Sequence, residues 1–159
     1  LKENNMKKYL VATFIAFLGA FIANAQENKM IDVSKCEASN LTVEGSTLIS
    51  TGYGQLIFPE YDYTDYTGIN FEVSNFKKLD ANATNAVCSL KIEYTQDGET
   101  VKVSMGFHRT GKKNIDFKSF KDEKIGIISI DPGTITKISI GMGKKKQVDV
   151  SNIVLVAKK

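Results

Sequence analysis

The stretch that decides the fold is residues 89–107, "SLKIEYTQDGETVKVSMGF", in which apolar and polar residues alternate on both sides of an Asp-Gly pair. Alternate positions share one face of an extended chain, and the apolar ones here are Leu90, Ile92, Tyr94, Val101, Val103, Met105 and Phe107. Asp97-Gly98 suits a tight primed turn, because such a turn needs positive φ angles and glycine adopts them at little cost. The stretch therefore predicts an antiparallel β-hairpin with one apolar face.

The same alternation recurs along the chain from Ile31 onward, and no window there has the spacing of an amphipathic helix. Further strands are predicted at residues 30–36, 41–45, 54–58, 68–74, 114–120, 135–142 and 147–156. Residues 77–86, "KKLDANATNA", predict a substantial loop. About nine short strands in one domain imply two packed sheets, because a single open sheet would leave one apolar face in water. The predicted fold class is all-β, a two-sheet antiparallel β-sandwich of the jelly-roll type.

The last predicted strand contains a break in its alternation. Val148 and Val150 would face away from the side on which Ile153 and Leu155 lie. One extra residue at Ser151-Asn152 would turn both pairs toward the core. We therefore expect a β-bulge at this position.

The front of the chain resembles a secretory signal peptide. Lys7 and Lys8 precede an apolar run over residues 9–23, and Ala23-Asn24-Ala25 supplies small residues around a cleavage site. The apolar run is shorter than the roughly 20 residues that cross a bilayer. We expect residues 1–25 to be the signal peptide, with residues 1–5 upstream of Met6, and residues 26–159 to form a single domain with no membrane span. The expected location is secreted or periplasmic.

Charge and cysteine content narrow the classes of partner. The net charge of +3 falls to +1 without Lys2, Lys7, Lys8 and Glu3 of the leader, and so small an excess argues against a nucleic-acid binder. Cys36 and Cys88 are the only two cysteines. An exported protein can oxidise them to a disulfide, and two unpaired thiols in apolar runs are equally compatible with the sequence.

Four stretches taken in order resemble a known family. They are "YDYTDYTGINFEV", "CSLKIEYTQDGETVKV", "NIDFKSF" and "ITKISIGM" with "VDVSNIVLV". Over residues 30–157 this order is similar to the galactose-binding-like, carbohydrate-binding jelly rolls of bacterial secreted glycan-degrading proteins. The resemblance implies glycan binding without catalysis. Sugar-binding members usually present tryptophan, which this chain lacks, so tyrosine would have to take its place.

Residues 59–68, "PEYDYTDYTG", hold the first candidate site. If this segment is extended, Tyr61 and Tyr63 point to the same side and could stack on successive sugar units. The alternative is that the tyrosines cap the core while the carboxylates solubilise a turn. We expect Tyr66 to belong to the core.

Three further groups are candidates for ligand binding. His108 and Arg109 lie in a predicted turn, and the planar fork of Arg109 could bind a sugar diol or a uronate; the alternative is an exposed basic turn. Tyr53, between two glycines, is a third aromatic candidate. Residues 144–146, three lysines at a hairpin tip, would either bind acidic polysaccharide or keep an edge soluble.

No enzyme signature is present in the sequence. A single histidine, with no Gly-x-Ser-x-Gly and no His-Glu-x-x-His motif, removes the common hydrolase and zinc patterns. We expect no catalytic residues and no cofactor, with Asp149 a candidate ligand for a structural calcium ion. The expected function is binding of a glycan at a sandwich face or edge; the alternative is a structural or protein-interaction domain of the periplasm or cell surface.

Overall fold

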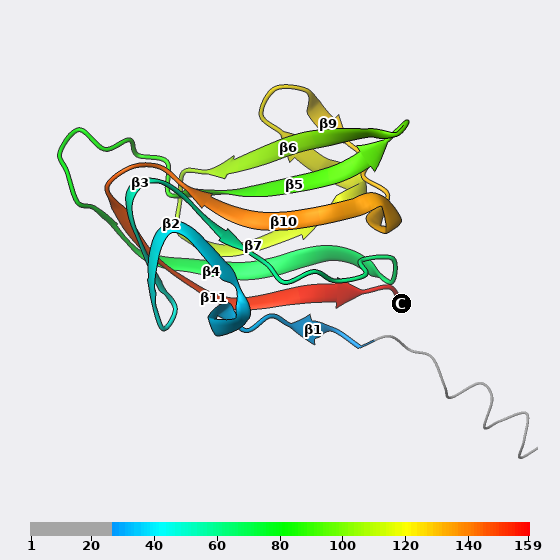
Figure 1. Ribbon diagram of the computed structural model, residues 1–159, viewed down its shortest axis with the longest axis horizontal. Coiled ribbons are helices and arrows are strands. Elements are labelled where there is room, and N and C mark those ends of the chain that lie inside the picture. Colours follow the sequence, from blue (N-terminus) through cyan, green and yellow to red (C-terminus); the bar gives the residue numbers. More distant parts are fainter. Residues whose placement is uncertain (1–26) are drawn as a thin grey trace, which may run out of the picture.

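The computed structural model of the protein describes residues 27–159, and the expected signal peptide lies outside this range. The described part is built almost entirely of antiparallel strands (Figure 1). The strands in chain order are β1 (Lys29–Met30), β2 (Glu37–Glu44), β3 (Thr47–Ile57), β4 (Tyr66–Lys78), β5 (Cys88–Gln96), β6 (Glu99–Phe107), β7 (Gly111–Asp116), β8 (Phe120–Asp122), β9 (Gly126–Ile128), β10 (Ile135–Met142) and β11 (Lys146–Ala157). Three short 3₁₀ turns occupy Val33–Lys35, Phe117–Ser119 and Pro132–Thr134.

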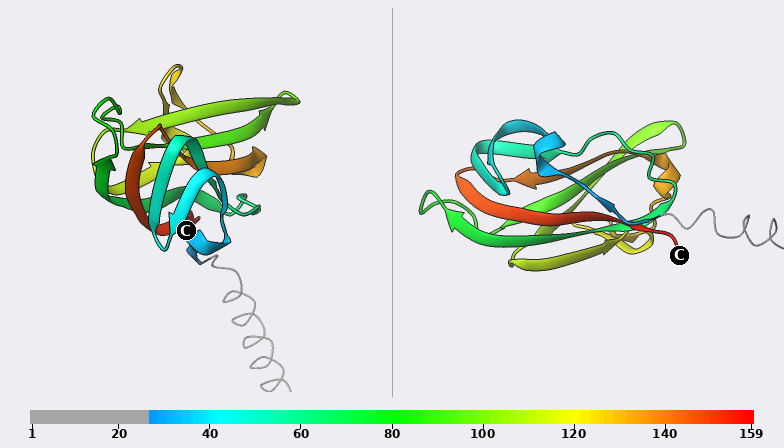
Figure 2. Two further views of the ribbon diagram at one scale, coloured as in Figure 1. Left: turned by 60° about the vertical axis from the view of Figure 1, so that its left-hand side comes forward. Right: turned by 90° about the horizontal axis from the view of Figure 1, so that it is seen from below.

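One curled sheet supplies both layers of the sandwich. Its strands follow the order β6-β5-β10-β3-β11-β4-β7, with β2 on the free edge of β3 and β1 beside β11. The second half of β3 pairs with β10, whereas its first half pairs with β11. Strand β3 therefore passes from one layer to the other, and the sheet folds over on itself there (Figure 2).

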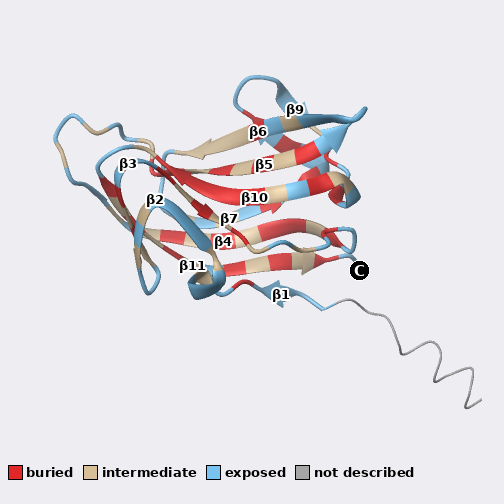
Figure 3. Ribbon diagram, viewed as in Figure 1, coloured by how far each residue is buried: buried red, intermediate tan, exposed pale blue. Residues whose placement is uncertain are grey.

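The core lies between the two layers and is filled by alternate residues of the central strands (Figure 3). Fully buried members include Ile69, Phe71, Leu90, Ile92, Ile138, Ile140, Val148, Val150, Ile153 and Leu155. Tyr66 is also buried, so its expected place in the core is confirmed. Each inward residue leaves its two sequence neighbours on the outer face of its sheet, because side chains alternate along a strand.

The hairpin from which the fold was predicted is confirmed. Strands β5 and β6 pair from Cys88 with Phe107 to Gln96 with Glu99. Asp97 and Gly98 have φ angles of 52° and 81°, as a primed turn requires. The bulge in β11 is also confirmed, because the register against β4 shifts between Ser151 and Val154.

Two predicted strands are wrong in detail. The segment predicted as a strand at 30–36 contains a 3₁₀ turn, because the Asp32 side chain accepts a hydrogen bond from the Ser34 amide at 2.9 Å. The segment predicted at 114–120 is interrupted in the same way, since Asp116 accepts from the Lys118 amide at 2.8 Å. An aspartate that bonds the backbone two residues ahead offers the chain a turn instead of the strand ladder.

Two further properties follow from the described part of the chain. Cys36 and Cys88 are free thiols; Cys36 is half-buried and Cys88 is buried. In this structure the two cysteines are therefore not joined by a disulfide. None of the helical segments within residues 27–159 is long and apolar enough to cross a membrane.

Candidate functional site

The outer face of the sheet formed by β3, β10, β5 and β6 is polar. Cross-strand pairs place Ser139 opposite Lys91, and Lys91 opposite Ser104. The neighbouring row is made of Gly141, Ser89 and Gly106. Small side chains therefore lie beside Lys91 in the middle of the face.

A pocket of about 330 Å³ opens on this face, and we call it the sheet pocket. Its floor is the sheet, and one wall is the turn that joins β8 to β9. The side chains that define it are Gln55, Lys91, Glu93, Lys102 and Ser104 on the sheet and Asp122, Glu123, Lys124 and Ile125 on the turn. Ile125 is 65% exposed and gives the pocket an apolar wall.

Asp122 fixes this wall to the edge of the sheet. Its carboxylate accepts hydrogen bonds at 2.8 Å from the backbone amides of Ser104, Lys124 and Ile125. The Glu123 amide also donates to the Ser104 carbonyl oxygen at 3.0 Å. Burial raises the pKa of Asp122, but the three amide donors outweigh it and hold the pKa below its ordinary value. The β8–β9 turn is thus held against strand β6 by a charged anchor.

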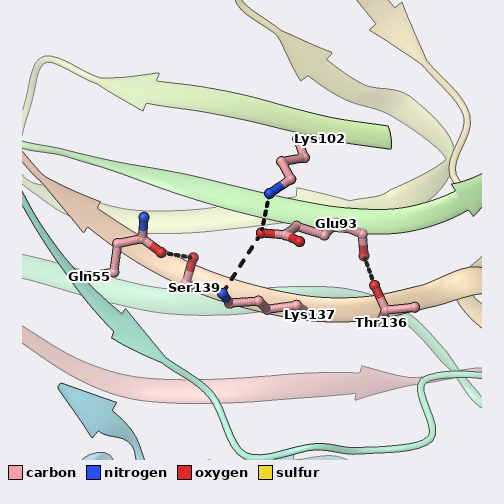
Figure 4. A network of polar contacts seen from close by, with 6 residues as sticks. All are labelled: Gln55, Glu93, Lys102, Thr136, Lys137 and Ser139. Atoms are coloured by element: carbon pink, nitrogen blue, oxygen red, sulfur yellow. Dashed lines mark hydrogen bonds and ion pairs between the residues drawn. The ribbon is translucent and has the colours of Figure 1, made fainter. Parts of the chain in front are cut away.

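A charge network crosses the face beside the pocket (Figure 4). One carboxylate oxygen of Glu93 lies 3.5 Å from the Lys102 ammonium and 3.8 Å from that of Lys137. Ser139 donates to the Gln55 side chain at 3.5 Å. These contacts set the Gln55 amide and the Glu93 carboxylate on the same side of the sheet, where both can reach a ligand.

A second depression of about 480 Å³, the edge pocket, lies next to this network. It is lined by Lys35, Glu37, Ile57, Phe58, Pro59, Glu60, Tyr63, Thr136 and Lys137. Lys137 lines the edge pocket and is paired with Glu93 of the sheet pocket. The Glu93–Lys137 ion pair therefore stands between the two depressions.

The structure does not present Tyr61 and Tyr63 as the expected platform. Asp62 accepts a hydrogen bond from the Thr64 amide at 2.9 Å, which makes the segment a turn instead of an extended strand. Tyr63 is only 2% exposed, and burial raises the pKa of its phenol. Its ring meets that of Tyr61 edge-on, with the centroids 6.1 Å apart. The Lys29 ammonium lies 4.2 Å from the centroid of the half-buried Tyr61 ring, so this ring already has a cationic neighbour.

The other candidates lie at the surface, outside the lining of both pockets. Tyr53 is 74% exposed and precedes Gln55 by two residues on β3, so the two side chains leave the strand on the same face. His108 and Arg109 are exposed in the turn between β6 and β7, where the Arg109 carbonyl oxygen accepts from the Lys113 ammonium at 2.8 Å. Of these three residues, only Tyr53 shares a strand face with a residue of the sheet pocket, whereas the buried Tyr63 lines the edge pocket.

The three consecutive lysines have three different environments. The Lys144 ammonium lies 5.1 Å from the centroid of the Tyr53 ring. Lys145 pairs with Asp80 at 2.7 Å, and Lys146 is buried. The three lysines therefore do not form one anion-binding cluster, because two of the three ammonium groups already have partners inside the protein.

Sequence reasoning missed the sheet pocket, although its signal was present. The outward positions of residues 89–107 and 135–142 are the polar half of the same pattern that predicted the hairpin. Within the described range, no group of three or more His, Cys, Asp or Glu side chains is placed to hold a metal ion.

Comparison with known proteins gives matches of structure only. No family model matches the chain, and no curated protein matches it by sequence. The family 11 carbohydrate-binding module of the cellulosomal cellulase Lic26A-Cel5E of Clostridium thermocellum is 18% identical, with 85% of this chain and 97% of that one covered at a TM-score of 0.49. The module solved in complex with a β-1,3-1,4-mixed-linked tetrasaccharide gives the same identity and score, with 84% and 98% covered.

An agarase, AgWH50C, has a TM-score of 0.54 and 12% identity. The match covers 84% of this chain but only 25% of the agarase, so it concerns one part of that enzyme and shows the fold alone. The antiparallel jelly-roll fold expected from the sequence is confirmed.

Proposed function

We propose that the protein is an exported, non-catalytic glycan-binding module that binds its ligand on the outer face of the β3-β10-β5-β6 sheet. The observation that carries the proposal is the sheet pocket, which combines hydrogen-bonding side chains with an apolar wall. Sugars present hydroxyl groups at their edges and apolar C–H faces, and binding pockets match such ligands with a few placed polar groups among apolar ones. Gln55, Lys91 and Ser104 supply donors and acceptors, while Ile125 supplies apolar contact.

The shape of the face suits a chain better than a single sugar. The sheet pocket and the edge pocket lie on either side of the Glu93–Lys137 ion pair. A polymer laid across the sheet would contact both depressions and the polar side chains between them. The fold shared with part of an agarase supports a polysaccharide as the ligand class.

Affinity electrophoresis in gels that contain soluble polysaccharides tests the proposal. We expect at least one polymer to retard the wild-type protein, and the double variant Tyr53→Ala/Gln55→Ala to bind it about tenfold more weakly or worse, since the few side chains that dominate a binding surface, tyrosines often among them, each cost more than ~1 kcal/mol when truncated. Gln96→Ala is the matched control, because Gln96 is exposed at the end of β5 and lines neither pocket. Free migration of the wild type in every gel would contradict the proposal, as would release of reducing ends from the bound polymer.

One observation favours protein binding as the second candidate function. Ile125 and Ile127 in and beside the β8–β9 turn are 65% and 72% exposed, and adjacent exposed apolar side chains are typical of contact surfaces. In that case Ile127→Ser would abolish association with a protein partner, and the Tyr53→Ala/Gln55→Ala variant would behave as wild type in every polysaccharide gel.

A further inference from the structure

Lys91 occupies the centre of the polar face. It lies on the middle strand β5, with Ser139 of β10 on one side and Ser104 of β6 on the other. Its side chain is half-buried and lines the sheet pocket. These two direct neighbours are short, and the other charged side chains that line the pocket are Glu93, Lys102, Asp122, Glu123 and Lys124.

Gly141 keeps the space in which the end of the Lys91 side chain lies. A Cβ atom on residue 141 would sit 2.7 Å from Lys91 Cε and 3.2 Å from Lys91 Nζ. It would also sit 2.8 Å from Ser89 Oγ. The absence of a side chain at position 141 therefore allows the ammonium to rest in a notch on the sheet.

The charges around Lys91 leave it without a partner. Glu93 already pairs with Lys102 and Lys137, and Asp122 accepts from three backbone amides. Glu123 lies over Gly106, where a Cβ would meet its Oε1 at 2.0 Å. Across residues 27–159, no carboxylate forms an ion pair with Lys91 and no acceptor takes a hydrogen bond from it.

A half-buried cation with no ion-pair or hydrogen-bond partner among the described residues is free to bind an external anion. Hydrogen bonds between charged partners are roughly twice as strong as neutral ones, and they strengthen where water is partly excluded. A neutral sugar would leave this charge unmatched. A carboxylate or sulfate group would meet the Lys91 ammonium, while the hydroxyl and amide groups of Ser104 and Gln55 bind the ring hydroxyls.

We propose that the sheet pocket selects a glycan that carries an anionic substituent, a uronate carboxylate or a sulfate ester, which pairs with Lys91. This inference rests on the proposed function, because it names the class of glycan that the same face binds. It assigns recognition of the charge to Lys91 and recognition of the sugar ring to its polar neighbours.

The experiment compares polymers that differ only in charge. Polygalacturonate is paired with its carboxyl-reduced form and a carrageenan with its desulfated form, and each is tested with the wild type, Lys91→Gln, Lys91→Arg and Gly141→Ala. We expect the wild type to prefer the charged member of at least one pair by about tenfold or more, with binding that weakens as salt is added. The pair that shows the preference identifies carboxylate or sulfate as the recognised group.

The variants test whether the preference depends on the charge of Lys91 and not on a change in folding. We expect Lys91→Gln to lose most of the preference, Lys91→Arg to keep part of it, and Gly141→Ala to reduce it by displacing the ammonium. Lys112→Gln, a charge change at an exposed position of β7, is the control and should leave the preference unchanged. Near-UV circular dichroism checks that each variant is folded.

Three outcomes overturn the inference in distinguishable ways. Equal binding of charged and neutral members by the wild type refutes the anionic preference while glycan binding stands. A preference that Lys91→Gln retains assigns the selection to another residue and removes Lys91 from the site. Absence of binding to every polymer, charged or neutral, refutes the proposed function and this inference with it.

Discussion

Neighbouring residues of the same type have different roles in this protein, and the three lysines at 144–146 are the clearest case. Lys146 is 2% exposed, and its ammonium donates to Thr84 Oγ1 at 2.7 Å and to the Ala86 carbonyl oxygen at 2.5 Å. Both acceptors lie in the loop between β4 and β5. A buried lysine therefore ties this loop to the start of β11.

The first prediction concerns this lysine. Lys146→Ala should lower the free energy of unfolding by about 2–4 kcal/mol, because it removes two hydrogen bonds and leaves a cavity. Lys145→Ala removes only an exposed ion pair with Asp80 and should cost much less stability than Lys146→Ala, because solvent screens the pair. Urea unfolding of the two variants measures the difference. Equal losses of unfolding free energy in the two variants would show that the buried hydrogen bonds of Lys146 contribute no more than the exposed Lys145–Asp80 ion pair.

At the scale of elements, the β8–β9 hairpin depends on a single carboxylate. Asp122 is 8% exposed, and one of its oxygens accepts from Ser104 of β6 while the other accepts from two amides of the hairpin turn. The pocket wall therefore follows the position of Asp122, although the hairpin itself is only six paired residues long.

The second prediction concerns the hairpin. Asp122→Asn sets an NH₂ group against the Ser104 amide, so the free energy of unfolding should fall by about 1–3 kcal/mol and glycan binding should weaken. Asp116→Asn is the control, because Asp116 is exposed and serves a turn outside the pocket. Urea unfolding and affinity electrophoresis measure the two effects. Unchanged binding in a destabilised Asp122→Asn protein would remove the hairpin from the binding surface.

Acid should act on the same anchor. The pKa of Asp122 lies below the ordinary value of 3.8 in the folded protein, so its contribution to stability is present above that pH and is lost as pH falls through the folded pKa. The Asp122→Asn protein should lack this part of the acid response.

For the whole molecule, burial of ionisable groups in one shared core determines the response to alkali. Burial and then Asp32 raise the pKa of Cys36 from 9.0 to about 11. Burial raises the pKa of Cys88 from 9.0 to about 12, against the opposing effect of Lys113 and Lys146. The folded state therefore keeps both thiols protonated at pH values where the unfolded chain ionises them.

The third prediction follows from these directions. The contribution of the thiols to stability is complete below pH 9.0 and is lost as pH rises toward about 12, with a slope of up to about 1.4 kcal/mol per pH unit for the buried Cys88 and a smaller one for the half-buried Cys36, where solvent screens the charge. The lowered pKa of Lys146, caused mainly by burial, works in the opposite direction below 10.5 and offsets part of the slope. Urea unfolding from pH 7 to 11 measures the net fall.

Cys88→Ala tests the origin of that fall. The substitution should reduce stability at every pH through lost packing, but it should flatten the slope above pH 9, since one titrating group is gone. An unchanged slope would show that the buried thiol does not govern the alkaline response.

Local patterns were enough to predict much of this molecule. Alternation predicted the hairpin of β5 and β6, because a side-chain period of two fixes which residues enter the core. The slip between Val150 and Ile153 predicted the bulge, and Asn152 takes the positive φ of 51° found there. Tyr66 was placed in the core through the resemblance to the carbohydrate-binding jelly rolls, in which a structural aromatic takes this place, and it is buried. The short 3₁₀ turns at Asp32 and Asp116 were missed, since a side-chain hydrogen bond competed successfully with the strand pattern.

The sequence by itself determined an all-β jelly roll, its main hairpin and its bulge, because these depend on neighbours along one strand. Only the tertiary structure decided where the candidate site lies. Lys91 comes next to Gly141, and the turn that holds Asp122 comes to Ser104, through pairing of strands and a hairpin distant in sequence. Tyr61 and Tyr63 do not form a stacking platform, because the Asp62 side chain makes the segment a turn and Tyr63 is buried in the core. Outside the regular strands, the exposure of a side chain follows from what packs against it, and the alternation along one segment does not contain that information.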